Sequence, residues 1–280
     1  MPHNRNGRTE HQFSGARSPL DVAVAVRDRS VIDMVRRAVE ARDVVLAFQP
    51  VVQSCRPEVP AFFEGLIRIR DETGRIIPAR DFMEPVETSE LGRQIDCLSL
   101  ELGLATLAEE PSVRLAVNMS ARSIGYPRWI KTLRRGLARD ETIGERLILE
   151  ITESSAMLMP DLVGVFMHGL QMEGVAFALD DFGAGFTSFR YLREFYFDIV
   201  KIDGQFIQGI ADSPDNQVLT EALLSISRHF DMFTVAENVE NARDAAFLTS
   251  AGVDCLQGYH FGAPTLSPPW KHAATAKMTA

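Results

Sequence analysis

The feature that most constrains the fold is a regular alternation between short apolar segments and longer amphipathic ones. Eight short runs are rich in β-branched residues, which favour strands, and apolar residues at helical spacing fill most of the intervals. Such alternation is typical of β-α-β units, which build parallel sheets. The predicted strands are residues 44–48, 61–69, 113–117, 147–151, 175–179, 199–202, 233–235 and 254–256. The predicted helices are residues 31–41, 91–109, 120–139, 160–172, 216–229 and 241–251.

The number of predicted elements favours an α/β fold of the closed (β/α)8 type. Eight strands with intervening helices in about 240 residues match the size of a TIM-like barrel. A doubly wound open sheet is the alternative, because alternation alone does not decide whether the sheet closes. No G-x-G-x-x-G follows a predicted strand, which disfavours a dinucleotide-binding open sheet.

The composition excludes several functional classes. The formal net charge of −9 argues against DNA binding through a broad basic face, although metal ions, Lys or Arg could still neutralise a small anionic ligand. The three cysteines are scattered without C-x-x-C spacing, which argues against a disulfide framework and a zinc site. No apolar run reaches the roughly 18 residues of a membrane span, so we expect a soluble cytoplasmic protein.

The predicted elements fall in one domain, residues 21–270. Residues 1–20 are polar and rich in Asn, Arg, His, Gly and Ser, which predicts a disordered tail. We expect residues 271–280 to form a flexible C-terminus.

The strongest local signal for chemistry is a pair of adjacent carboxylates. The apolar run 175–179 ends in Asp180 and Asp181, followed by the glycine-rich sequence Phe-Gly-Ala-Gly-Phe. Two neighbouring carboxylates repel each other and are costly to desolvate unless a cation lies beside them. Ligands that offer only oxygen suit a hard divalent ion such as Mg²⁺.

Polar residues also occur near the ends of the other predicted strands. In a parallel barrel the C-terminal ends of the strands face one mouth, where barrel enzymes place their chemistry. The acids among these residues predict one or two divalent metal ions at that mouth. The predicted metal ligands are Glu64, Asn118, Glu150, Asp180 and Asp181. The other polar residues at these strand ends are Arg68, Ser120, Glu153, Lys201, Asp203, Glu237, Glu240 and Gln257.

Each of these residues taken alone has a purely structural explanation. A single Glu at a strand end is most often solvated, Asn118 or Asp181 could cap a helix, and Lys201 with Asp203 could form an ordinary ion pair. Independent caps explain poorly why mostly acidic residues recur at successive strands. The joint pattern therefore favours a site.

Nine tracts in the same order carry a resemblance to a known family. The chain resembles the EAL-domain family of cyclic di-GMP phosphodiesterases from Phe48 to Pro264. The matching tracts are FQPVV, EGLIR, IIPARDFMEPVE, VNMS, LILEITES, LDDFGAGFTSFRYL, IVKIDGQFI, VAENVE and CLQGYHFGAP. The chain departs from the family pattern at Gly65, where the family has Ala, and near Ile69, where a frequent Trp is missing.

The resemblance implies a fold and an activity. The implied fold is the EAL-type barrel, whose first strand runs antiparallel to the rest. The implied reaction is hydrolysis of one phosphodiester bond of cyclic di-GMP to linear 5'-pGpG. The implied cofactor is Mg²⁺ or Mn²⁺ in one or two ions, with Ca²⁺ inhibitory. The resemblance also implies a homodimer formed through the region after the predicted strand 175–179.

The resemblance also implies which residues hold metal. Glu64, Asn118, Glu150 and Asp180 look like ligands of the first ion. Asp180 would bridge to a second ion, which Asp181 would also serve.

The remaining site residues match family positions with catalytic, substrate-binding or supporting roles. Lys201 resembles the lysine that contacts the attacking water, and Glu237 the general base or second-metal partner; with Glu64 they form the implied catalytic set. Gln49 and Arg68 look like substrate contacts. Gln257 is also assigned to substrate binding, and it resembles the amide that orients the innermost residues of the site. Glu153 resembles the acid that steadies the loop after residues 175–179.

Three functions are compatible with these residues. The first is an active phosphodiesterase, which the complete ligand set favours, because degenerate relatives usually lose a ligand. The second is a catalytically silent cyclic di-GMP receptor or protein-interaction module. The third is an unrelated metal-dependent barrel hydrolase, which would share the carboxylates but not all the flanking tracts.

Overall fold

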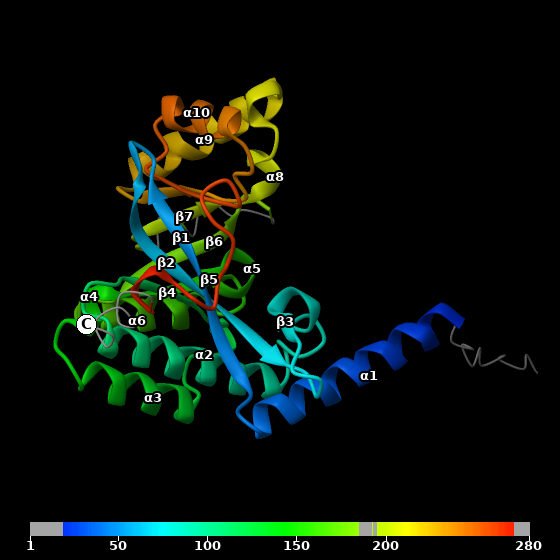
Figure 1. Cartoon of the computed structure of the whole chain (residues 1–280). Helices are drawn as coiled ribbons and strands as arrows, with labels where there is room; N and C mark the ends of the chain where they lie inside the picture. Colours follow the sequence, from blue (N-terminus) through cyan, green and yellow to red (C-terminus); the bar gives the residue numbers. More distant parts are fainter. Residues whose placement is uncertain (1–18, 185–191, 193–194, 272–280) are drawn as a thin grey trace, which may run out of the picture.

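The computed structural model describes residues 19–184, 192 and 195–271, and its main feature is a closed barrel (Figure 1). Eight strands pair in the order β1-β9-β8-β7-β6-β5-β4-β2, and pairing between β1 and β2 closes the ring. The predicted barrel is therefore confirmed over the open sheet. The strands are β1 (Val44–Gln53), β2 (Arg56–Arg70), β4 (Leu115–Asn118), β5 (Leu147–Thr152), β6 (Ala176–Phe182), β7 (Ile199–Ile202), β8 (Phe233–Ala236) and β9 (Cys255–Gln257).

The first strand runs against its neighbours, as the resemblance implied. Strand β1 pairs antiparallel with both β2 and β9, while the pairs from β2 through β4 to β9 are parallel. A tight turn joins β1 to β2 in place of a crossover helix, which antiparallel neighbours do not need. The pairing places Gln49 opposite Glu64.

Helices surround the barrel. In Figure 1, α2 and α3 lie on one flank and α9 and α10 at the other end of the molecule, while α1 projects away beside β3. The long helices are α1 (Pro19–Glu40), α2 (Glu90–Glu109), α3 (Pro127–Leu137), α6 (Pro160–Gln171), α9 (Pro214–His229) and α10 (Ala242–Ala251). Shorter elements are α4 (Ile143–Arg146), α5 (Glu153–Ala156), α8 (Gly204–Ile207), η1 (Ala79–Asp81), η2 (Ala121–Ser123) and η3 (Ile210–Asp212).

The structure differs from the predicted elements in several places, including β1 and β2, which are longer than the predicted 44–48 and 61–69. Helix α1 begins at Pro19, so it is longer than the predicted 31–41 and includes the last two residues assigned to the tail. The predicted helix 120–139 is interrupted, because Gly125 adopts a φ of 79° and Pro127 starts α3. A short strand, β3 (Ile76–Pro78), extends the sheet beside β2; three residues were too few to show a period. Residues 1–18 and 272–280 lie outside the described residues.

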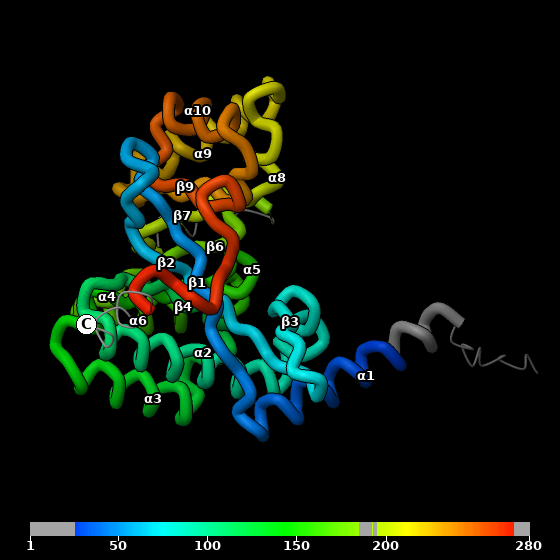
Figure 2. Tube along the Cα trace, viewed as in Figure 1, coloured from blue at the N-terminus to red at the C-terminus, as the bar shows by residue number. Residues whose placement is uncertain are grey.

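The C-terminal segment covers the outer face of the β1–β2 ribbon, which has no crossover helix of its own. Thr265 forms a β-bridge with Phe48, and the Trp270 ring packs edge-on against Phe48 and Phe63, with centroids 5.2 and 4.7 Å apart. Figure 2 shows this segment crossing the two strands. It completes the apolar layer that helices supply around the rest of the barrel.

None of the helices in the described part of the chain combines the length and the apolar character needed to cross a membrane.

Candidate functional site

The inner face of the barrel changes from apolar to polar along every strand of the ring. Side chains of a strand alternate between its two faces, so residues two apart point the same way. Seven strands place an apolar residue in the barrel interior and a polar one two positions further along, while antiparallel β1 reverses that order with Val51 and Gln49. The pairs are Phe62 and Glu64, Ala116 and Asn118, Ile148 and Glu150, Ala178 and Asp180, Ile199 and Lys201, Val235 and Glu237, and Cys255 and Gln257.

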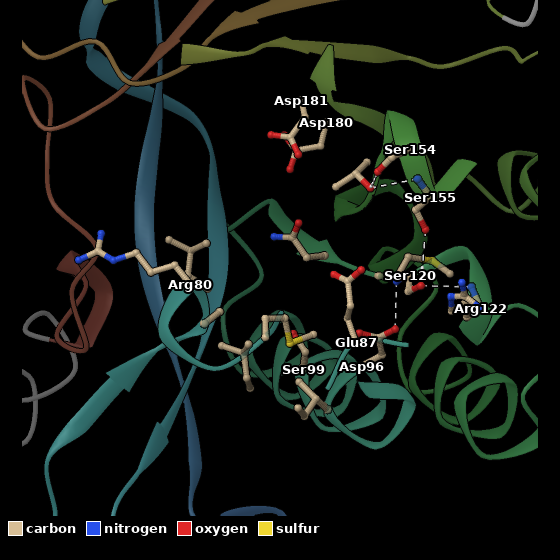
Figure 3. Close-up of a pocket in the computed structure, with 18 of the residues that line it drawn as sticks. Arg80, Glu87, Asp96, Ser99, Ser120, Arg122, Ser154, Ser155, Asp180 and Asp181 are labelled. Carbon is tan, nitrogen blue, oxygen red and sulfur yellow. Dashed lines mark hydrogen bonds between the residues drawn. The ribbon is translucent and has the colours of Figure 1, made fainter. Parts of the chain in front are cut away.

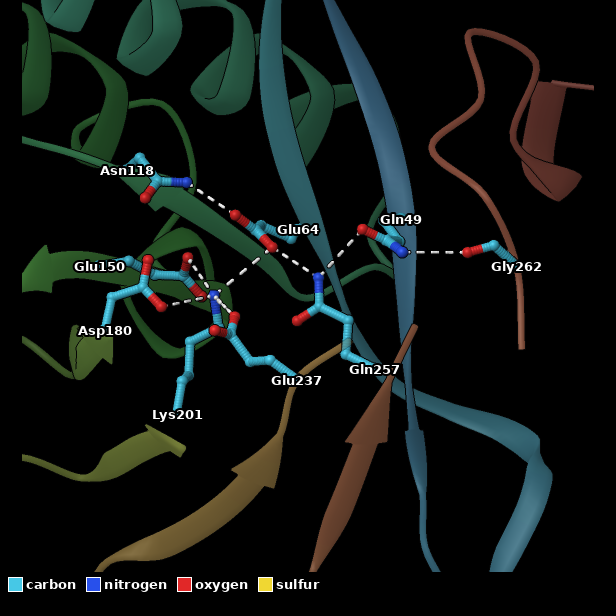
Figure 4. Close-up of polar contacts among 9 residues, drawn as sticks. All are labelled: Gln49, Glu64, Asn118, Glu150, Asp180, Lys201, Glu237, Gln257 and Gly262. Atoms are coloured by element: carbon cyan, nitrogen blue, oxygen red, sulfur yellow. Dashed lines mark hydrogen bonds and ion pairs between the residues drawn. The ribbon is translucent and has the colours of Figure 1, made fainter. Parts of the chain in front are cut away.

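Lys201 lies at the centre of the polar layer (Figure 4). Its ammonium is 2.8 Å from Glu237 Oε1, 3.0 Å from Asp180 Oδ1, 3.1 Å from Glu150 Oε2 and 3.5 Å from Glu64 Oε2. The Lys201 side chain is 1% exposed and that of Glu150 is fully buried. Four carboxylates thus surround one cation, which leaves an excess of buried negative charge.

Two amide side chains bond to Glu64, and a third supports one of them. Asn118 Nδ2 donates to Glu64 Oε1 at 2.8 Å, and Gln257 Nε2 donates to Glu64 Oε2 at 2.6 Å. Gln257 Nε2 also lies 3.3 Å from Gln49 Oε1, and Gln49 Nε2 donates to the Gly262 carbonyl at 3.1 Å. This chain of hydrogen bonds orients both oxygens of Glu64 and ties them to the C-terminal segment (Figure 4).

The electrostatics of the cluster reflect burial opposed by Lys201. Desolvation raises the pKa of Glu237 to about 8 and raises that of Glu150 well above its ordinary value, although Lys201 acts in the opposite direction. For Glu64, desolvation is outweighed by Lys201 and by hydrogen bonds from Gln257 and Asn118, so its pKa is lowered. Desolvation likewise opposes the charge of Lys201, but the surrounding carboxylates raise its pKa well above the ordinary range.

The two adjacent aspartates lie at the end of β6. One oxygen from each of Asp180, Asp181 and Glu237 can be chosen so that all three lie within 4.8 Å of one another. Asp181 has a φ of 57°, an unusual backbone conformation that re-aims its side chain, and desolvation followed by repulsion from Asp180 raises its pKa to about 6. Glu153, which begins α5, accepts a hydrogen bond from the Gly183 amide at 3.3 Å in the turn that follows.

The donor set fits a hard divalent cation. The grouped ligands offer only carboxylate and amide oxygens, as Mg²⁺ and Mn²⁺ prefer. Glu150 Oε1 is buried without a hydrogen-bond partner among the described residues, which is costly for a carboxylate unless a cation or proton satisfies it.

A cavity of about 720 Å³ opens beside these carboxylates (Figure 3). Glu64, Asp180 and Asp181 line one side of it, while Arg80 and Asp96 come from η1 and α2. Asp96 is 5% exposed and accepts hydrogen bonds from the Ser120 amide at 3.0 Å and the Ser123 hydroxyl at 2.6 Å. Burial raises its pKa to about 6, above the opposing effect of these hydrogen bonds.

Sequence reasoning missed the wall formed by η1 and α2. The available signal was Asp96 itself, a charged residue between Ile95 and Cys97 on the buried face of an amphipathic helix.

The predicted residues do not all meet in one place. Arg68 lies in a separate cavity of about 230 Å³ with Gln49, Arg80 and Tyr259, and its Nη1 donates to the adjacent Ile67 carbonyl. Asp203 caps α8 by accepting a hydrogen bond from the Gln205 amide at 2.7 Å. Glu240 lines the smaller cavity. The tract that continues Asp180 and Asp181, residues 185–191, lies outside the described residues.

Comparison with known proteins gives relatives over most of the chain. The chain is 30% identical over 239 residues to the cyclic di-GMP phosphodiesterase PdeF of Escherichia coli K12, covering 84% of this chain and 32% of PdeF. It is 32% identical over 237 residues to MucR of Pseudomonas aeruginosa, a bifunctional diguanylate cyclase and cyclic di-GMP phosphodiesterase, covering 82% of this chain and 34% of MucR. The chain therefore spans about a third of the length of these curated relatives.

Solved structures of similar domains have the same fold. The MucR phosphodiesterase in complex with c-di-GMP superposes with a TM-score of 0.74 at 29% identity, covering 87% of this chain and 99% of that one. The EAL domain of Pseudomonas aeruginosa FimX bound to c-di-GMP gives a TM-score of 0.75 at 25% identity, covering 84% and 96%. Because the EAL domain family matches residues 32–264 as well, this chain belongs to the EAL domain family.

Proposed function

We propose that this chain hydrolyses one phosphodiester bond of cyclic di-GMP and releases linear pGpG. The observation that carries the proposal is the cluster of Glu64, Glu150 and Asp180 around Lys201, beside a cavity of about 720 Å³. That cavity is lined by Glu64, Asn118, Asp180 and Asp181. Relatives named as cyclic di-GMP phosphodiesterases support the substrate.

The proposed metal ligands are those expected from the sequence. Glu64, Asn118, Glu150 and Asp180 would hold one Mg²⁺ or Mn²⁺, and Asp181 with Asp180 would serve a second. A bound divalent cation would neutralise phosphate charge and lower the pKa of a water molecule. This neutralisation lets a protein of net charge −9 accept an anionic dinucleotide.

The protein's own groups supply the remaining chemistry. Water attacks phosphorus in line with the departing 3′ oxygen, and negative charge builds on the phosphoryl oxygens. The buried ammonium of Lys201 contacts the attacking water and stabilises that charge. Glu237, a carboxylate 2.8 Å from the Lys201 ammonium, accepts the proton from the water.

The surrounding residues bind and position. Gln257 and Asn118 fix the orientation of Glu64. Arg68 and Gln49, which line the adjacent smaller cavity, contact the nucleotide, with Arg68 on a phosphate. Glu153 holds the turn after Asp181 through the Gly183 amide.

The test is hydrolysis of cyclic di-GMP by the purified chain, with products resolved by chromatography. We expect pGpG with Mg²⁺ or Mn²⁺ and none with EDTA or Ca²⁺. Glu110→Gln, on the far end of α2, is the matched control for site variants. Retained ligand binding without product would instead support the silent receptor, and product formation in EDTA would contradict the metal assignment.

We also propose that the chain forms a homodimer. The resemblance implied an interface in the region after β6, where Tyr196 is 77% exposed and residues 185–191, 193 and 194 lie outside the described residues. Sedimentation analysis of the chain and of Tyr196→Glu checks this, because a charge on the interface should shift the population to monomer. The cytoplasmic location stays a prediction from the sequence.

A further inference from the structure

The short helix α5 lies between two loops that follow strands with proposed metal ligands at their ends. The loop after β4 follows Asn118, and the turn after β6 follows Asp180 and Asp181. Thr152 caps α5, with its Oγ1 accepting a hydrogen bond from the Ser155 amide at 3.3 Å. The helix is thus anchored directly to the end of β5.

One face of α5 holds the loop after β4. The Ser155 hydroxyl accepts a hydrogen bond from the Ala121 amide at 2.8 Å and lies 3.5 Å from the Ser120 hydroxyl (Figure 3). On its other side, the same loop is held by Asp96 of α2 through the Ser120 amide. The backbone that immediately follows Asn118 is therefore clamped between α2 and α5.

The first residue of the same helical turn reaches the other loop. Glu153 Oε2 accepts a hydrogen bond from the Gly183 amide at 3.3 Å, in the turn directly after the paired aspartates. Ser155 and Glu153 belong to one four-residue helix, so a displacement of α5 moves both contacts together.

We propose that Ser155 is a positioning residue for the metal ligands, and that α5 joins the loops after β4 and β6 through Ser155 and Glu153. Where it concerns metal ligands, the inference rests on the proposed function. The hydroxyl itself touches no proposed ligand. It acts by holding the backbone beside Asn118, and through α5 it restrains the turn beside Asp181.

Ser154 provides a matched control within the same helix. It is the same residue type, but its hydroxyl lies 3.3 Å from the Thr152 hydroxyl, on α5's own cap, and within the described part of the chain it makes no hydrogen bond to either loop. Ser154→Ala therefore removes a hydroxyl from α5 and leaves both loop contacts in place.

Hydrogen exchange measured by mass spectrometry tests whether α5 joins the two loops, and it requires neither metal nor turnover. In Ser155→Ala we expect faster exchange in peptides covering residues 117–124 and also in those covering residues 178–184. Ser154→Ala should match the wild-type chain in both. Faster exchange in residues 117–124 alone would overturn the coupling, because it would show a local hydrogen bond and nothing more.

Mn²⁺ affinity, measured by titration calorimetry, tests the positioning of the ligands. We expect Ser155→Ala to weaken Mn²⁺ binding about three- to tenfold, Ser155→Thr to restore most of it, and Ser154→Ala to leave it unchanged. The double variant with Glu153→Ala should lose less affinity than the product of the two single effects, because each already loosens the same helix.

The outcomes separate this inference from the proposed function. If the chain makes no pGpG but shows the expected exchange and Mn²⁺ effects, the proposed function is contradicted and the link through α5 is supported. If the chain makes pGpG and Ser155→Ala raises only the KM for cyclic di-GMP, the positioning role of Ser155 is contradicted. That result would assign Ser155 a direct substrate contact.

Discussion

The two layers of the barrel interior are built from the same strands and the same inward face, yet they have opposite physical character. One layer consists of apolar side chains, including Val51, Phe62, Ile148 and Val235, all less than 9% exposed. Two residues further along lies the polar layer, centred on Lys201. Burial is favourable in the first layer, whereas in the second it raises the pKa of Glu150 and Glu237, which the proposed function requires to be charged.

This difference indicates how the molecule divides its tasks. The apolar layer and the helices around the sheet supply the stability, and the polar layer uses part of it to hold like charges close together. Substitutions in the apolar layer should therefore lower stability and spare turnover, whereas removing a carboxylate from the polar layer should lower turnover and spare stability. Strand β5 allows this comparison within one strand, through Ile148 and Glu150.

The largest effect is expected from Glu150→Gln. The amide keeps the shape of the side chain but is a much weaker metal ligand, so turnover with Mg²⁺ should fall about 10³-fold or more. The melting temperature in EDTA should rise, because the charged carboxylate is unfavourable in this buried position. A lower melting temperature in EDTA would show that Glu150 contributes to stability, contrary to this division.

Lys201→Met should be the most destabilising change within the polar layer. It leaves four carboxylates without their shared cation, and breaking a buried ion pair typically costs about 3–5 kcal/mol of unfolding free energy. Urea unfolding in EDTA measures this, and saturating Mg²⁺ should recover part of the loss. With Lys201→Ala we expect kcat to fall more than affinity, and a change in KM alone would argue against contact with the attacking water.

Ile148→Ala should give the reverse signature of Glu150→Gln. Ile148 is 5% exposed in the apolar layer, and truncation should lower the unfolding free energy by about 2–4 kcal/mol. Turnover per folded molecule should stay within about twofold of the wild-type value, since the Ile148 side chain lies in the apolar layer and not in the polar one. A loss of turnover as large as that of Glu150→Gln, at a temperature where the variant is folded, would show that the layers are not independent.

The pH dependence of the unfolding free energy should report the titration of Glu237 in the polar layer. Glu237 has a pKa raised from 4.5 to about 8, so the folded state binds the proton more tightly than the unfolded state. Stability in EDTA should therefore be greatest at low pH in this window and fall as pH rises from about 4.5 to 8, by at most about 1.4 kcal/mol per pH unit for this group. Glu237→Gln should flatten the profile, and an unchanged slope would contradict the raised pKa.

Much of the architecture was accessible from the sequence because parallel strands are buried on both faces. Short apolar runs, most of them rich in β-branched residues, located all eight barrel strands. The paired aspartates at the end of one such run predicted a metal site, which stays a prediction, and the structure groups their carboxylates with that of Glu237. Short or irregular elements were missed, including β3 and the break before α3, because three residues or one glycine leave no periodic signal.

The arrangement around the site was less accessible. Glu64 lies in the middle of β2 and not at its end, because β2 continues past the barrel mouth to pair with β3. Asp96 and Ser155 come from helices, where a polar residue ordinarily faces solvent, so their contacts with the loop after β4 depend on how α2 and α5 pack.

The sequence by itself determined the alternation of strands and helices and the residue types available for oxygen ligation, because both depend on local pattern and on side-chain chemistry. Only the tertiary structure decided that the sheet closes and that one lysine lies within 3.5 Å of four carboxylates. It also decided that a helix of four residues touches both the loop after β4 and the turn after β6. Those facts depend on strand register and helix packing, which bring together residues far apart in the chain, such as Gln49 and Gly262, 213 positions apart.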